Sequence, residues 1–247
     1  MFLWFHKFGS PPHFYRIAGK WLPWLGILFA LLLVAGLYGG LVLAPPDYQQ
    51  GDSYRIIFIH VPSAWMSLFI YVVMAFCGIV IIVWRMKLAE VVLISSAPIG
   101  ASFTFLALVT GSLWGKPMWG AWWVWDARLT SELILLFLYL GVIGLYNAIE
   151  DKRVAARAVA ILTIVGVVNI PIIHYSVMWW NTLHQGPTIT KFDTPSIHWS
   201  MLIPLLLMAL AFQVYYLLTL FRRCRAELLQ RERNSKWVEE LSEIKEP

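Results

Sequence analysis

Apolar residues fall into six long runs along the sequence, and each run is long enough to cross a bilayer once. A helix of about 20 residues spans the roughly 30 Å hydrocarbon layer, and it satisfies its own backbone hydrogen bonds, which lipid cannot do. The runs cover residues 21–43, 62–84, 91–113, 129–149, 154–178 and 197–220. This pattern predicts an all-α, polytopic integral membrane protein with six transmembrane helices.

The composition agrees with a bilayer environment. Of the 247 residues, 60% are hydrophobic and 13% are charged, and the mean hydropathy is +0.68. A soluble domain is about 45–50% apolar and about 25% charged, so a soluble enzyme and a disordered chain are excluded. The two cysteines, Cys77 and Cys224, form no CxxC or CxxCH motif, which argues against thiol exchange and against covalent haem attachment to this chain.

The basic residues predict the orientation in the membrane. Of the 19 Lys and Arg residues, 15 lie in the N-terminal segment, in the connections after the second and fourth runs, and in the C-terminal tail. The positive-inside rule therefore places both termini in the cytoplasm, in keeping with an even number of spans. The net charge of +5 is thus explained by topology, with lipid as the neighbour and no nucleic acid required.

The chain divides into three parts. Residues 1–20 form a cytoplasmic or interfacial segment rich in aromatic residues, residues 21–220 form the six-helix membrane domain, and residues 221–247 form a cytoplasmic tail. Arg and Glu alternate at helical spacings in this tail, which predicts a solvated helix. The first run is too long for the core of a signal peptide and is expected to be an uncleaved helix.

A tryptophan-rich motif marks the second outward segment, a periplasmic loop expected at about 112–128. The stretch WGKPMWGAWWVWD holds five of the 14 tryptophans: Trp114, Trp119, Trp122, Trp123 and Trp125. An aromatic belt at the headgroup level needs only one or two per helix end. Five indoles in one loop instead favour an apolar platform for a large planar ligand, since indole faces stack on extended π-systems. Asp126 closes the motif, and its alternative role is to cap the fourth helix.

Four of the six histidines map to the outer half of the chain. His60 precedes the tryptophan motif and His184 follows it in the last outer loop. Two neutral imidazoles from opposite sides can take both axial positions of a haem iron whose porphyrin rests on the indoles. His174 and His198 rank below this pair because they lie at the ends of the fifth and sixth runs.

Four basic residues lie on the outward side: Arg55, Lys116, Arg128 and Lys191. An arginine such as Arg128 can bind a carboxylate in bidentate fashion, which would suit the propionate groups of haem. The alternative for each of them is simple snorkelling to the interface.

The motif is similar to the tryptophan-rich (WWD) signature of the haem-handling family of cytochrome c biogenesis. The match is carried by Trp119, Gly120, Trp123, Trp125 and Asp126, while Trp122 falls at a variable position. Six spans, the length of the chain, and histidines on either side of the motif resemble in particular the cytochrome c maturation protein C (haem exporter protein C) branch of the bacterial system I pathway. This resemblance covers the whole chain.

The resemblance implies a haem carrier of the bacterial inner membrane. Such a protein holds non-covalent, transiently bound b-type haem at the periplasmic face and delivers it to the haem chaperone, protein E. It works beside the small membrane protein D and the ABC transporter subunits A and B. By position, His60 and His184 become the axial iron ligands, and the platform and docking surface become Trp114, Trp119, Trp123, Trp125 and Asp126.

Three functions are left open by the residues themselves. A haem-holding and transfer protein, with no enzymatic activity of its own, fits the cluster of aromatic and histidine residues on one face. A transmembrane exporter of haem or another solute is the first alternative, and a membrane redox protein that uses haem or quinone is the second. GSLWGKPM is not a P-loop, because Pro117 replaces the Ser/Thr and the glycine spacing differs, so any ATP must be hydrolysed by a partner.

Overall fold

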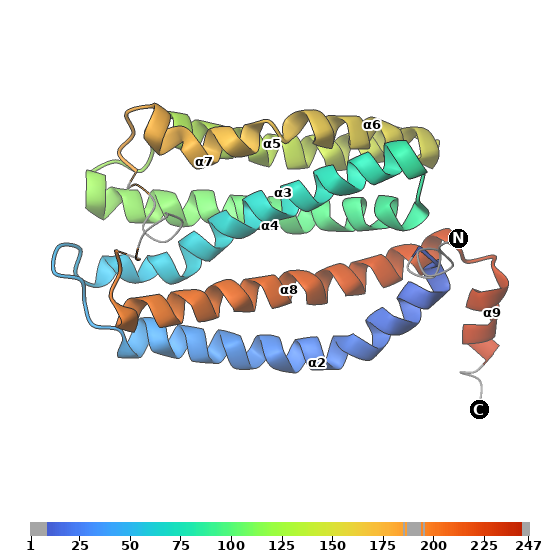
Figure 1. The fold of residues 1–247 in the computed structure, drawn as a ribbon, viewed down its shortest axis with the longest axis horizontal. Coiled ribbons are helices and arrows are strands. Elements are labelled where there is room, and N and C mark those ends of the chain that lie inside the picture. The colour runs from blue at the N-terminus through green and yellow to red at the C-terminus, as the bar shows by residue number, and fades with distance from the viewer. Residues whose placement is uncertain (1–8, 185, 187–193, 195, 244–247) are drawn as a thin grey trace.

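The computed structural model describes residues 9–184, 186, 194 and 196–243. It contains six helices that are long and apolar enough to cross a membrane, and the described residues form no β-strand. The helices lie side by side along one long axis, and α2 begins at the end of the bundle where α8 ends (Figure 1). The predicted all-α fold with six membrane-spanning helices is therefore confirmed.

Three of the six spans are built from two helical elements each. In chain order the elements are α2 (Pro11–Tyr38) with the π-helical turn η1 (Gly39–Leu43), η2 (Asp52–Ile56) leading into α3 (Ile57–Trp84), α4 (Lys87–Trp119), α5 (Ala127–Ala148), α6 (Lys152–Gly166) with α7 (Asn169–Trp179), and α8 (Trp199–Arg231). The short helix α9 (Lys236–Glu243) follows the last span.

The core lies among α3, α4, α5, α6 and α8, and α2 packs on the outside against α8. Tyr71, Met74, Leu93 and Leu135 are fully buried in this core. On α2, by contrast, most large side chains remain exposed, as expected for a helix whose outer face contacts lipid. Gly36 allows close packing against α8, because a Cβ atom there would lie 2.8 Å from the Met208 side chain.

The first helix begins earlier than the apolar run predicts. It starts at Pro11, so residues 11–20 continue the first span as a helix. Pro23 lies inside α2, and the helix bends in its first half (Figure 1). A proline removes one backbone hydrogen bond and is a common cause of such a bend.

The fifth span, which the sequence predicts as one helix, is broken near its middle between α6 and α7. A Cβ atom at Gly166 would collide with the hydroxyl of Tyr71, so the backbone approaches α3 closely here. Asn169, the first residue of α7, donates a hydrogen bond from Nδ2 to the Ser131 carbonyl on α5 at 2.9 Å. Irregular backbone at membrane depth is tolerated where neighbouring helices supply such partners.

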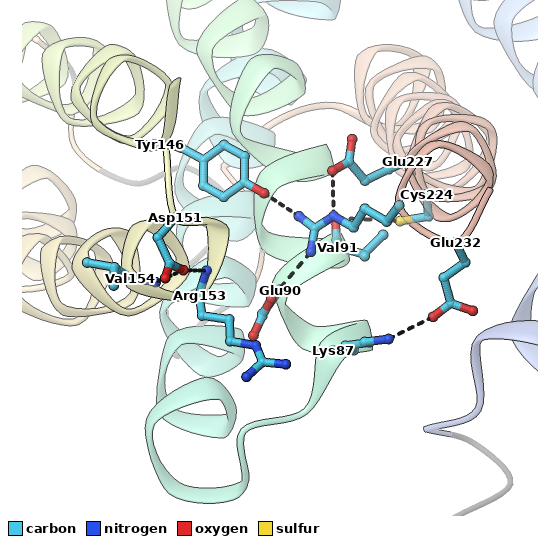
Figure 2. A network of polar contacts seen from close by, with 11 residues as sticks. Lys87, Glu90, Val91, Tyr146, Asp151, Arg153, Val154, Cys224, Glu227 and Glu232 are labelled. Carbon is cyan, nitrogen blue, oxygen red and sulfur yellow. Dashed lines mark hydrogen bonds and ion pairs between the residues drawn. The ribbon is translucent and has the colours of Figure 1, made fainter. Parts of the chain in front are cut away.

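Asp151 starts the first half of this span. Its carboxylate accepts hydrogen bonds from the backbone N–H groups of Val154 and Arg153 at 3.2 and 2.8 Å (Figure 2). These two bonds lower the pKa of the Asp151 carboxyl. Asp151 is therefore a helix cap, and it fixes the point where α6 begins.

The C-terminal tail is less solvated than its charge pattern predicts. Helix α8 continues to Arg231, and Cys224 and Leu228 are fully buried against the bundle. Arg231 forms ion pairs with Glu227 at 2.6 Å and with Glu90 of α4 at 3.3 Å. The expected helix is therefore solvated on one face only, because successive turns carry Cys224 and Leu228, which are buried on the other face.

Candidate functional site

The tryptophan-rich motif lies at the end of the bundle opposite the two termini, where α4 connects to α5 (Figure 1). A pocket with a cavity volume of about 180 Å³ opens here among α3, α4, α5 and α7. Its walls are mainly apolar and include Ile57, Val61, Leu68 and Ile173. A concave, apolar site with a few polar groups is the usual form of a small-molecule site.

The loop of the motif is shorter than the expected 112–128, because α4 continues through Pro117 to Trp119. Gly120 ends the helix with φ +75°, a left-handed conformation that glycine adopts without strain. Asp126 then caps α5 by accepting a hydrogen bond from the Leu129 N–H at 2.8 Å. Only residues 120–126 are non-helical, so Trp114 and Trp119 project from a rigid element.

His60 is held in one orientation and one tautomer by α4. Its Nδ1 lies 3.1 Å from the Ala107 carbonyl and 3.0 Å from Thr110 Oγ1. The carbonyl only accepts, and the Thr110 hydroxyl already donates to Leu106 O at 2.6 Å, so Nδ1 of the neutral ring carries the proton. The lone pair is then on Nε2, which is the arrangement of a metal-binding histidine with an ordered second partner.

Gly111 provides the space for this ring. A Cβ atom at position 111 would lie 2.9 Å from Cε1 of His60. Any larger residue would therefore displace the imidazole or the helix. The close approach of α4 to α3 at this point is what lets Ala107 and Thr110 reach Nδ1.

His184 lies opposite His60 across the pocket, although the two residues are far apart in sequence. The ring centroids are 6.3 Å apart with an interplanar angle of 32°. Metal–imidazole bonds are about 2.0–2.1 Å long, so two imidazoles on opposite sides of one metal ion have centroids about 6 Å apart. The separation therefore fits a pair of axial ligands.

A bare metal ion is a poorer match for this pair. The described residues contain no group of three or more His, Cys, Asp or Glu side chains arranged to hold a metal ion. A metal bound by two imidazoles alone needs further ligands, and a macrocycle brings its own. The donor set of the pocket thus suits iron in a porphyrin better than a free ion.

Three of the five motif tryptophans line the pocket: Trp114, Trp119 and Trp123. Trp114 contacts the His60 ring edge-on at 5.7 Å, and Trp119 lies 6.0 Å from the His184 ring. Trp122 and Trp125 do not line it and are 55% and 75% exposed. The motif therefore has an inner face toward the histidines and an outer face toward the surroundings.

Two buried polar atoms of the motif have no hydrogen-bond partner among the described residues. They are Nε1 of Trp123 and Oδ2 of Asp126. Trp114 differs, because its Nε1 donates to Oε1 of Gln50 at 3.0 Å. An unpaired buried donor such as the Trp123 N–H is costly unless a ligand or water completes it.

The basic residues expected on the outward side have different surroundings in the structure. Arg128 lines the pocket, next to the buried Glu132 one turn further along α5. Arg55 instead pairs with Asp52 at 2.8 Å and donates to the Gly40 carbonyl, and Lys116 donates to the Gly120 carbonyl. Lys191 lies outside the described residues.

Two pocket residues, Trp65 and Glu132, were not among the site residues expected from the sequence. His174, which the sequence ranks below the axial pair, also lines the pocket. Helical periodicity gives a signal for Trp65, since Ile57, Val61, Ala64 and Leu68 share its wall with His60. His198 does not line the pocket and caps α8, accepting from the Ser200 N–H.

The fold and this pocket define a class: a multi-pass membrane protein with an aromatic, two-histidine pocket at one end of its helix bundle. The sequence profile of the family described as "Heme exporter protein C" matches residues 4–239. This chain belongs to that family.

Full-length relatives support the assignment. The chain is 51% identical to "Heme exporter protein C" of Haemophilus influenzae over 98% of its own length and 99% of the relative's. It is 52% identical to the protein of the same name from Escherichia coli K12 over 96% of this chain and 95% of that one. A "putative cytochrome c biosynthesis ccmC-like mitochondrial protein" of Marchantia polymorpha is 49% identical over 73% of this chain and 76% of its own.

Proposed function

We propose that this protein binds haem in the aromatic pocket and passes it on during cytochrome c maturation. The observation that carries the proposal is the 6.3 Å separation of the His60 and His184 rings across a pocket lined by tryptophan. The names of its relatives, which refer to heme export and to cytochrome c biosynthesis, support the same cargo.

His60 and His184 are the proposed axial ligands, with unequal roles. His60 is fixed by Ala107 and Thr110 on a rigid helix. His184 lies in the connection between α7 and α8, where its backbone N–H binds the Thr182 hydroxyl. A loop histidine can release the iron with less rearrangement than a helix histidine. We therefore propose that His184 is the ligand exchanged during transfer.

We propose that the tryptophans of the motif have two roles, contact with haem and docking of a partner. Trp114, Trp119 and Trp123 support the macrocycle, and its carboxylate groups meet Arg128 and the Trp123 N–H, which has no partner among the described residues. Trp122 and Trp125, exposed on the outer face, are suited to docking a partner, because exposed aromatic residues dominate interface energetics. Asp126 keeps its cap role and offers Oδ2 to the same surface.

The setting of this activity is also part of the proposal. We place the pocket at the periplasmic face of the inner membrane and both termini in the cytoplasm, on the distribution of Lys and Arg. The acceptor is the haem chaperone, protein E, with the small protein D and the ABC subunits A and B as neighbours. Haem supplies the iron to which the imidazoles bind. The protein itself holds and hands over cargo, without a catalytic group of its own.

Haem content of the purified protein tests the proposal. His60→Ala and His184→Ala should each lower the haem that co-purifies with the full-length protein from haem-replete cells. His198→Asn is the matched control, since it alters a histidine at the same end of the bundle while keeping a good helix cap. Equal haem content in all four proteins would contradict the axial pair, and a colourless wild type would contradict haem binding altogether.

A further inference from the structure

A second and larger cavity lies between α4, α5 and α8, at the end of the bundle where α8 ends. Its volume is about 1070 Å³, and polar residues line most of it. We call it the basic groove, because five bases line it: Lys87, Lys152, Arg223, Arg231 and Arg233. Nothing in the proposed haem function uses this groove.

The acidic residues of the groove are already paired. Glu227 binds Arg231, and Glu232 binds both Lys87 at 3.1 Å and the Trp237 N–H at 2.6 Å. Glu90, just behind them, also pairs with Arg231; these contacts are seen in Figure 2. These three carboxylates pair with two of the five bases, Arg231 and Lys87, so the bases exceed the acids by two charges.

The other three bases have no acidic partner among the described residues. Lys152 donates to the Ile149 and Tyr146 carbonyls, and Arg223 donates to the Ser95 carbonyl at 3.2 Å. Arg233 is exposed and forms no ion pair in the part of the chain that the structure describes. The groove thus keeps an excess of positive charge, which favours an anionic ligand.

The depth of the groove restricts the kind of anion. Lys87 begins α4 and Lys152 begins α6, so these bases lie where the spans meet the headgroup layer. The floor is formed by Ile94, Pro98 and Ile143, further along α4 and α5 toward the hydrocarbon. A ligand that fills both parts must be anionic at one end and apolar at the other.

We propose that the basic groove binds an anionic phospholipid, with its phosphate headgroup among Lys152, Arg223 and Arg233. The acyl chains lie along Ile94, Pro98 and Ile143. Basic pockets between transmembrane helices are known to bind such headgroups. Bound lipid would neutralise the excess charge and bridge α5 and α8, which both pack on α4.

Thermal unfolding in mixed micelles tests the proposal with the full-length protein. Phosphatidylglycerol is titrated against phosphatidylcholine with the same acyl chains, and native mass spectrometry counts the bound lipid. The groove variant is Arg223→Gln/Arg233→Gln. The control is Lys20→Gln/Arg157→Gln, which removes the same charge from exposed positions outside the groove. Lys152→Gln, on α6, probes the site without altering α8.

We expect phosphatidylglycerol to raise the unfolding temperature of the wild type and of the control more than phosphatidylcholine does. The groove variant should need about 30-fold more of this lipid, the fold-change that two bases at about 1 kcal/mol each represent. Lys152→Gln should show a smaller change in the same direction. Inorganic phosphate should give no shift, because it cannot use the apolar floor.

Four results would overturn the proposal. Equal responses of the groove variant and the control would reduce the effect to general surface charge. Equal stabilisation by the two lipids would remove the anionic selectivity, and stabilisation by inorganic phosphate would indicate a free-anion site. Haem that displaces the lipid from the wild type would assign the groove to a carboxylate macrocycle instead.

Discussion

The two ends of this helix bundle differ in the side chains that line their cavities. At one end, aromatic rings and imidazoles surround a pocket whose described lining includes one arginine, Arg128, and one carboxylate, Glu132. At the other end, ion pairs and unpaired bases surround the basic groove. In our proposals, the first end takes a flat, mostly apolar cargo, and the second binds an anionic lipid headgroup. Substitutions at one end should therefore leave the properties of the other end unchanged.

The largest expected effect is on the charged end. Arg231→Ala removes contacts to Glu90, Glu227 and the Tyr146 hydroxyl and leaves Glu90 without its base. Losing charged hydrogen bonds of this kind should cost about 2–3 kcal/mol of stability. The midpoint of thermal unfolding should fall by several degrees while haem retention stays unchanged. Arg222→Ala, exposed on the same helix, is the control, and a matching loss of haem would show that the ends are coupled.

A steric change tests the aromatic end next. Gly111→Val places a side chain against Cε1 of His60 and should push the ring from its position. Overpacking costs about 1–3 kcal/mol, so haem loss to a scavenging protein should be about 10-fold faster. Gly144→Val, at a glycine with no neighbour within 4 Å, should leave the rate unchanged. The same rate in both variants would mean that the His60 position is irrelevant to holding haem.

Substitutions on the inner and outer faces of the tryptophan motif should have different effects. Trp119→Ala removes the ring beside His184 and should speed haem loss by about 2- to 10-fold, since one aromatic contact contributes about 0.5–1.5 kcal/mol. Trp122→Ala should retain haem but bind the acceptor chaperone less well in a pull-down. Faster haem loss from Trp122→Ala than from Trp119→Ala would reverse the assignment of the two faces.

The smallest effect is expected at Gln50. Its side chain accepts the Trp114 N–H, so Gln50→Ala leaves that donor unpaired and should speed haem loss by only about 2- to 5-fold. Gln49→Ala, whose side chain is exposed one position earlier, serves as control. A change as large as that of Gly111→Val would mean that Trp114 contributes more to holding haem than the His60 position does.

The sequence predicts the spans well because membrane helices are determined by local composition. The sequence predicts less where contacts between residues distant in sequence determine the local structure. The break before Asn169 follows the close approach of Gly166 to Tyr71, where a Cβ atom would not fit, and the burial of Cys224 depends on α4. Neither interaction has a local signal, so both parts were expected as regular elements.

The candidate site follows the same division. Placing His60 and His184 on either side of the motif already suggested a pair, and the structure adds their separation and the role of Thr110. Helical periodicity groups Trp65 with Val61 and Leu68 on one face of α3, but periodicity alone does not show whether such a face lines a pocket or packs in the core. Trp122 and Trp125 differ from their neighbours only in which way the seven-residue connection turns them, and sequence spacing does not specify that.

The central claim, that one iron is bound by both imidazoles, is tested most directly by the spin state of bound haem. The wild type should give a low-spin, six-coordinate electron paramagnetic resonance and optical spectrum. His184→Gly should become high-spin and return to low-spin when free imidazole is added, because the vacated loop position can admit it. A low-spin spectrum in His184→Gly without imidazole, or a five-coordinate wild type, would contradict the account.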